Sequence, residues 1–156
     1  MVCRYKATIE GNKIFMREYE IKENTTLYVL HIYLQNDLGF APDQMVMFRG
    51  LDKTNKVKGE YGLFDLGDGS MDRVTLGKTL SKGEIKLQYV YDLYSDRFLI
   101  LEYLSEEEEL ARRSYPRLTA ERGKNPDQFS DNYDDFEQMM EFNDLSEPSR
   151  DDELQD

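Results

Sequence analysis

The chain opens on a regular alternation of apolar and polar residues. Over residues 3–10 every second position is apolar: Cys3, Tyr5, Ala7 and Ile9. This period of two predicts a β-strand with one buried face, because successive side chains of a strand point to opposite sides. Gly11-Asn12 has the residue types of a tight hairpin turn. We therefore predict a second strand over residues 13–22, which carries apolar side chains on both faces.

A helical period follows the hairpin. Four leucines recur at spacings of three and four residues, namely Leu27, Leu30, Leu34 and Leu38. That spacing places them along one face of an α-helix. Thr26 precedes the stripe as a preferred N-cap residue, and Gly39 follows it as a preferred C-terminal stop. The pattern predicts a helix over residues 27–38.

Further strand-like segments complete the body of the chain. Residues 84–92 alternate in polarity and residues 98–103 are almost wholly apolar, which predicts one half-buried strand and one central strand. Shorter signals are a strand at 45–49, a weak edge strand at 60–64 and a helical turn at 74–80. A hairpin, a helix and then more strands pack most simply as one sheet with the helix across it. We predict an α+β fold: a β-grasp-like mixed sheet of about five strands, with one main helix packed on one face.

The charge of the chain is unevenly distributed. Residues 1–104 hold 14 Lys/Arg and 15 Asp/Glu, a net of −1, and residues 105–156 hold 6 and 17, a net of −11; the two sum to −12. No part has the basic surplus that phosphate binding needs, so direct nucleic-acid binding is disfavoured. We predict a core domain over 1–104, and an acidic, disordered tail over 130–156 whose composition cannot bury a core.

The sequence also limits compartment and chemistry. A lone cysteine allows no intramolecular disulfide, and no run of residues is long and apolar enough to span a membrane. Residues 1–6 lack the apolar stretch of a signal peptide. We therefore expect a cytoplasmic protein without a membrane segment. No set of residues has the pattern of a cofactor site, and no cofactor is predicted.

Three aspartates are the weak metal candidates. Asp65, Asp68 and Asp72 cluster in a glycine-rich loop, and hard cations prefer carboxylate oxygens. The spacing does not fit the calcium-loop template, because Phe64 and Leu66 fall where oxygen ligands should stand. A solvated turn is the simpler interpretation, and we assign no metal.

Two other residue types with chemical potential stand alone. His31 is the single histidine and lies beside the leucine stripe of the predicted helix, without a recognisable orienting partner. Cys3 lies on the apolar face of the first strand, where a thiol behaves as a small hydrophobic group. Both are interpreted as packed side chains, so no catalytic residue is predicted.

The acidic end contains one apolar group of residues. In a helix these side chains would share one face: Tyr133, Phe136, Met139 and Met140. Such a face is typical of a short segment that docks into a groove of another protein. Packing back on the domain, or remaining disordered, are the alternatives. We predict these four as partner-binding residues.

A family resemblance rests on the order of several short motifs. These are Tyr5-Lys6-Ala7-Thr8-Ile9, Ile14-Phe15-Met16-Arg17, Asn24-Thr25-Thr26-Leu27, Val74-Thr75-Leu76-Gly77, Leu87-Gln88-Tyr89-Val90-Tyr91-Asp92, Tyr115-Pro116-Arg117-Leu118 and Gly123-Lys124-Asn125-Pro126. In this order, over residues 3–129, they resemble the plasmid pRiA4b ORF-like family, also labelled insertion-element passenger or TnpR-like proteins. The resemblance implies that residues 105–129 pack back on the core, and that the protein is associated with a mobile element.

The chain departs from the family at two places. Relatives have a Phe-Gly-Asp-Gly-Trp turn and a histidine after the Tyr-x-Tyr-Asp strand, where this chain has residues 93–98 with neither Trp nor His. A cysteine and paired acids are also missing near residues 118–121. This chain therefore lacks any site that those groups form in relatives. The TnpR label implies recombination, which needs a nucleophile among arginines and a basic surface, and neither is present.

These observations favour a non-enzymatic protein-interaction module whose acidic tail modulates binding to a protein partner, and the tail's charge favours a basic one. The alternative is a small-molecule or metal-binding protein, or an enzyme, with a pocket at the edge of the sheet. The Asp65–Asp72 loop and His31 would then be the first candidates for its site.

Overall fold

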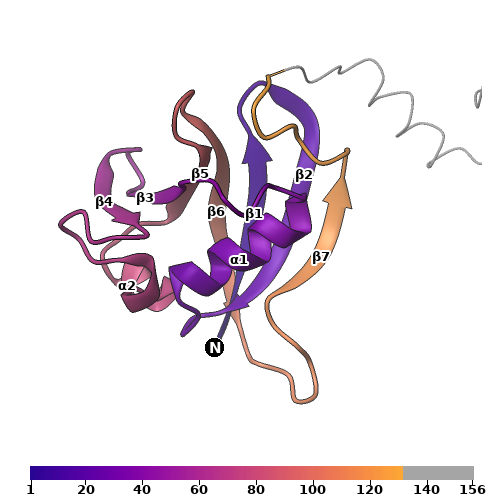
Figure 1. Ribbon diagram of the computed structural model, residues 1–156. Coiled ribbons are helices and arrows are strands. Elements are labelled where there is room, and N and C mark those ends of the chain that lie inside the picture. Colours follow the sequence, from indigo (N-terminus) through magenta and orange to yellow (C-terminus); the bar gives the residue numbers. More distant parts are fainter. Residues whose placement is uncertain (132–156) are drawn as a thin grey trace, which may run out of the picture.

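A computed structural model describes residues 1–131 of the protein (Figure 1). In these residues seven strands form one sheet: β1 (Val2–Ile9), β2 (Asn12–Lys22), β3 (Met47–Leu51), β4 (Val57–Gly62), β5 (Lys86–Asp92), β6 (Arg97–Glu107) and β7 (Arg117–Arg122). The helices are α1 (Leu27–Leu38), α2 (Leu76–Ser81) and a short 3-10 helix, η1 (Met71–Arg73). None of these helices is both long and apolar enough to cross a membrane.

The sheet has the order β4-β3-β5-β6-β1-β2-β7, and each neighbouring pair is antiparallel. The predicted β-grasp-like mixed sheet of about five strands with one main helix is therefore wrong, and the fold is mostly β. A mixed sheet needs a parallel pair, whereas β1 pairs antiparallel with both β2 and β6. The prediction also missed β7, since its charged residues Arg117, Glu121 and Arg122 hide any apolar alternation.

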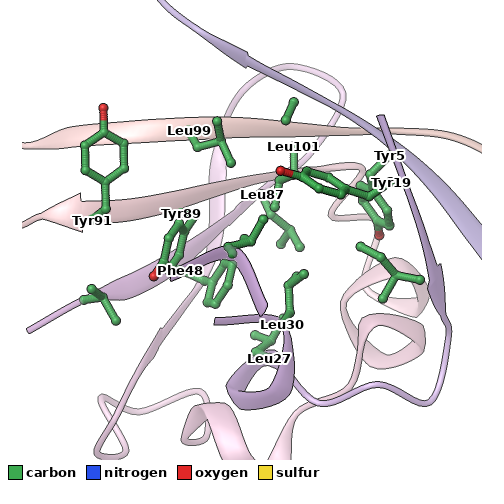
Figure 2. Close-up of a cluster of buried hydrophobic side chains, with 14 of the residues drawn as sticks. Tyr5, Tyr19, Leu27, Leu30, Phe48, Leu87, Tyr89, Tyr91, Leu99 and Leu101 are labelled. Carbon is green, nitrogen blue, oxygen red and sulfur yellow. The ribbon is translucent and has the colours of Figure 1, made fainter. Parts of the chain in front are cut away.

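Helix α1 begins and ends at the predicted residues because its caps are well defined. The hydroxyl of Thr26 accepts a hydrogen bond from the backbone N–H of Val29, and Gly39 takes the left-handed conformation with φ of 72°. The leucine stripe is buried against the sheet, where each leucine contributes roughly 1.5–3 kcal/mol. Figure 2 shows Leu27 and Leu30 on the side of the core near Phe48 and Leu87. One face of the sheet is thus covered by α1.

In residues 1–131 the opposite face of the sheet carries charge and no second layer of helices. Lys6 of β1 pairs with Glu18 of β2 and with Glu102 of β6, and Glu102 pairs in turn with Lys86 of β5. These residues alternate in sign across four adjacent strands, and cross-strand pairs of opposite charge stabilise a sheet. The row keeps this face compatible with water.

Both edges of the sheet are irregular. The β3–β4 register shifts between Gly50 and Leu51, and the β2–β7 register shifts between Glu18 and Tyr19. The Asp68 carboxylate also accepts a hydrogen bond from the backbone N–H of Glu60 on β4, at 2.9 Å. A bulge in an edge strand, or a side chain that already bonds one of its backbone N–H groups, discourages pairing with a strand of another chain.

The chain after β6 contacts the rest of the sheet. Strand β7 pairs with β2, and Asn125 donates to the backbone carbonyl of Asp37 at the end of α1. The buried Gln128 side chain accepts from the N–H of Ala41 at 2.8 Å and donates to the carbonyl of Tyr91 at 3.0 Å. These contacts place residues 123–128 across one end of α1 and β5.

Candidate functional site

A pocket of about 340 Å³ lies beside the first turn of α1 and is lined by Tyr28, Leu63 and Asp72. We call it the Tyr28 pocket. Its walls come from α1, from the loop after β4, and from η1. The backbone N–H of Leu27 donates to the carbonyl of Val74 at 2.8 Å, which fixes the helix next to the segment after η1. The pocket therefore lies between segments that the fold holds in place.

Apolar side chains close in sequence to the pocket-lining residues are also exposed. Tyr28 and Val29 project from the outer face of α1, and Phe64 and Leu66 from the loop that supplies Leu63. A group of exposed large apolar residues close to a pocket is typical of a binding surface.

The three aspartates of the loop have separate roles. Asp65 accepts hydrogen bonds from the backbone N–H groups of Gly67 at 2.7 Å and Gly69 at 3.1 Å, and these bonds lower the pKa of its carboxyl. Asp68 accepts from Glu60 on β4, and Asp72 accepts from the Ser70 hydroxyl. In residues 1–131 no group of three or more His, Cys, Asp or Glu side chains is placed to hold a metal ion. Of the three aspartates, Asp72 is the one that lines the pocket.

His31 lies behind the pocket. Its Nδ1 is 2.7 Å from the hydroxyl of Tyr89, and its ring packs edge-on against Tyr28 with 6.0 Å between ring centroids. The side chain is buried, and burial lowers the pKa of the imidazole below its ordinary value. His31 is therefore neutral at pH 7 and supports the pocket wall through Tyr28.

The folded protein should lose stability as the pH falls below about 6.5, in part through His31. Its pKa is lower in the folded than in the unfolded chain, so the unfolded state binds more protons in that range. We expect the free energy of unfolding to fall less steeply between pH 7 and about pH 5.5 in a His31→Gln variant than in the parent. Urea unfolding at several pH values measures this, and equal slopes in the two proteins would contradict it.

Cys3 is buried on the face of β1 that α1 covers. Burial first, and then the nearby Glu23 and Glu106 carboxylates, raise the pKa of the thiol to about 11. A thiol with so high a pKa carries almost no thiolate at neutral pH and reacts slowly.

A second surface lies at the turn between β5 and β6, residues 93–96, which we call the Tyr94 turn. Tyr94 in this turn is 99% exposed, and the neighbouring Leu93 is also exposed. Ion pairs fix the turn at both sides: Arg97 pairs with Asp92, and Arg49 of β3 pairs with Asp96. The tyrosine is thus presented on a rigid support.

The end of the described chain reaches the Tyr94 turn. Arg97 Nε donates to the Asp131 carboxylate at 2.7 Å. Phe129, two residues earlier, is exposed and follows the anchored Gln128. The predicted partner-binding residues Tyr133, Phe136, Met139 and Met140, and the acidic end from residue 132 onward, lie outside the described residues.

Sequence reasoning missed a buried ionic cluster. The Glu84 side chain is fully buried and accepts hydrogen bonds from the Tyr61 hydroxyl at 2.7 and 2.9 Å. Lys82 Nζ lies 3.1 Å from the Glu84 carboxylate and donates to the Tyr61 hydroxyl at 2.8 Å. Tyr61 and Glu84 are closed off from solvent, so we interpret the cluster as structural. The available signal was Gly50 and Gly59, two strand glycines that pair across β3 and β4.

Comparison with known proteins identifies the family. The sequence profile of the plasmid pRiA4b ORF-3-like proteins matches residues 3–156. The chain belongs to this family. The resemblance inferred from its motifs is thereby confirmed. No functionally curated protein matches the chain significantly.

A solved structure shares the fold of this pRiA4b ORF-3-like chain. It is the crystal structure of MM3350, a protein of unknown function from Methanosarcina mazei Go1. The TM-score is 0.70 at 21% sequence identity, over 90% of this chain and 79% of that one. At this identity the likeness shows the fold alone.

Proposed function

We propose that this protein is a non-enzymatic interaction module, and that the Tyr94 turn and the acidic end of the chain bind a basic protein partner. The observation that carries the proposal is Tyr94, which is 99% exposed on a turn fixed by ion pairs. Tyrosine is enriched among the residues that dominate binding energy, and a side chain on a rigid support loses little entropy on binding.

The charge of the chain supports a basic partner. Residues 130–156 contain 11 Asp/Glu against one Arg, a net of −10. Arg97 holds Asp131 beside the Tyr94 turn, so this acidic stretch starts next to the exposed tyrosine. A partner that contacts Tyr94 would meet Asp131, the first acidic residue of this stretch, at the same place. Complementary charge raises the rate of association and makes binding sensitive to salt.

The acidic stretch also contains apolar residues. Tyr133, Phe136, Met139 and Met140 lie in the acidic stretch and would give the partner an apolar contact.

We expect the protein to bind its partner in the cytoplasm. The TnpR-like and passenger labels of the family imply that its gene is associated with a mobile element. A transposase gene next to the gene of this protein is the expected observation, and its consistent absence would speak against that association.

Crosslinking tests the surface. A photo-reactive phenylalanine analogue at position 94 of the full chain should capture a basic protein in cells, because the side chain lies in the interface. The matched control is the same analogue at Lys53, an exposed residue of the β3–β4 turn. This turn lies at the end of β3 and β5 opposite to the Tyr94 turn. Products at both positions alike, or none at position 94, would refute the proposal.

The affinity of the protein for the captured partner then shows how much Tyr94 contributes to binding. We expect Tyr94→Ala to weaken binding about 30-fold, the effect of losing an anchor worth about 2 kcal/mol. A chain that ends at Asp131 should retain the dependence on Tyr94 and lose most of the weakening seen between about 50 and about 500 mM salt. An unchanged affinity in the Tyr94→Ala variant would remove Tyr94 from the interface.

The alternative, a binder of small molecules at a pocket, is favoured by a separate observation. The Tyr28 pocket combines an aromatic ring, an aliphatic side chain and a carboxylate. Pockets of this composition bind ligands by packing and orient them through a few polar groups.

A further inference from the structure

We propose that the Tyr28 pocket binds a guanidinium group, such as the side chain of an arginine in another protein. This goes beyond the proposed function, because it rests on the pocket at α1 and not on the Tyr94 turn.

The size of the pocket suits a single side chain. Its volume of about 340 Å³ lies at the lower end of the range for ligand sites, roughly 300–1,000 Å³. Leu63 supplies an aliphatic wall and Tyr28 an aromatic one. A long side chain could pack its methylene groups on Leu63 while its head reaches the polar end of the pocket.

The polar end of the pocket is a carboxylate with spare capacity. Asp72 accepts one hydrogen bond, from the Ser70 hydroxyl to its Oδ1. Within residues 1–131 Oδ2 has no hydrogen-bond partner, and Asp72 makes no ion pair. Arg73 follows it on η1 but does not line the pocket. An anionic ligand would be repelled here, and a purely apolar one would bury the carboxylate without compensation.

The aromatic wall narrows the choice among cations. The ring of Tyr28 packs edge-on against His31, and its hydroxyl makes no hydrogen bond in the described part of the chain. Guanidinium groups stack on aromatic faces and bond carboxylates through a planar fork, whereas an ammonium group offers a point charge. A tyrosine ring and a carboxylate in the same lining therefore favour guanidinium over ammonium.

The walls are fixed in advance of binding. The backbone N–H of Leu76 donates to the carbonyl of Thr25 at 3.0 Å, and that of Gly77 to the carbonyl of Glu23 at 2.8 Å. The Asp65 hydrogen bonds hold the loop that bears Leu63. A site that needs no rearrangement loses less free energy on binding.

Titration with a small probe tests the site on the full chain. We expect N-acetyl-arginine amide to shift the NMR resonances of Tyr28, Leu63 and Asp72, with a dissociation constant on the order of 1 mM for so small a ligand. N-acetyl-citrulline amide has the same shape without the charge, and should shift them at least about fivefold more weakly. Equal shifts with both probes, or none with arginine, would overturn the proposal.

Two variants locate the contact. Asp72→Asn keeps the oxygen that accepts from Ser70 and removes the charge, and we expect affinity for the arginine probe to fall about fivefold or more. Tyr28→Leu keeps an apolar wall without the aromatic face and should cost about threefold. Spectra that are otherwise unchanged show that each variant is folded. Binding that Asp72→Asn leaves intact would overturn the assignment, and this result is independent of any crosslink at position 94.

Discussion

Gly50→Ala is expected to lower the free energy of unfolding by about 3–5 kcal/mol. This is the opposite of the usual effect, because alanine normally stabilises a strand relative to glycine by roughly 0.5–1 kcal/mol. A methyl carbon at position 50 would lie 1.8 Å from Glu84 Oε1 and 2.8 Å from its Cγ. The fully buried Glu84 carboxylate cannot move aside without losing its bonds to Tyr61 and Lys82, and a buried charge left without its partners costs about that much.

A double-mutant cycle separates this clash from a general effect on β3. In a Glu84→Ala background the space beside Gly50 is free, so adding Gly50→Ala should cost less than about 1 kcal/mol. The measurement is urea unfolding of the four proteins, with circular dichroism to confirm the fold. If Gly50→Ala costs the same in both backgrounds, the glycine is required for a reason other than Glu84.

The same cluster shows where sequence reasoning reaches its limit. Gly50 and Gly59 lie just outside the strands predicted at 45–49 and 60–64, and the structure places both inside β3 and β4, where a glycine often marks a close approach of another group. Their partners Tyr61 and Glu84 come from different segments, and only the β3–β4–β5 pairing brings them together. The local pattern therefore revealed neither the close approach at these glycines nor the groups that make it.

Elements with local signals were predictable, and their arrangement was not. The bounds of α1 follow from the leucine stripe, Thr26 and Gly39, which all act within a few residues. Strand order and direction depend on pairing between distant residues, such as Tyr5 with both Tyr19 and Tyr103. A period of two says that a strand has a buried face, and it says nothing about which strand lies beside it. The β-grasp-like arrangement was an error of this kind.

The same limit applies to the candidate pocket: single residues stood out in the sequence, and their grouping did not. Asp72 and His31 stood out in the sequence by residue type, and the structure places the first in the lining and the second behind Tyr28. Tyr28 and Leu63 carry no local signal, since one is an exposed helix residue and the other follows an edge strand. They become neighbours only in the folded chain, where both line the same pocket.

Arg17→Met is expected to detach β7 and the segment that follows it, and to lower stability by about 3 kcal/mol. Arg17 stands between Phe15 and Tyr19 on the face that α1 covers, and it is only 3% exposed. Its guanidinium donates to the carbonyls of Met16 and Arg122, to that of Gly123, and to the Asn125 side chain, at 2.8–2.9 Å. Removing so many charge-assisted bonds at a buried site is costly.

The loss should be local, and two controls distinguish it from general destabilisation. Backbone amides of β7 should exchange with solvent much faster in Arg17→Met, while those of α1 change only with the global stability. Arg17→Lys keeps the charge but not the fork that reaches several acceptors, so it should cost nearly as much. Glu121→Gln should cost less than about 0.5 kcal/mol, because Glu121 is exposed and its carboxylate is 4.0 Å from Arg17. Equal protection losses in β7 and α1 would show that Arg17 supports the whole sheet and not this strand in particular.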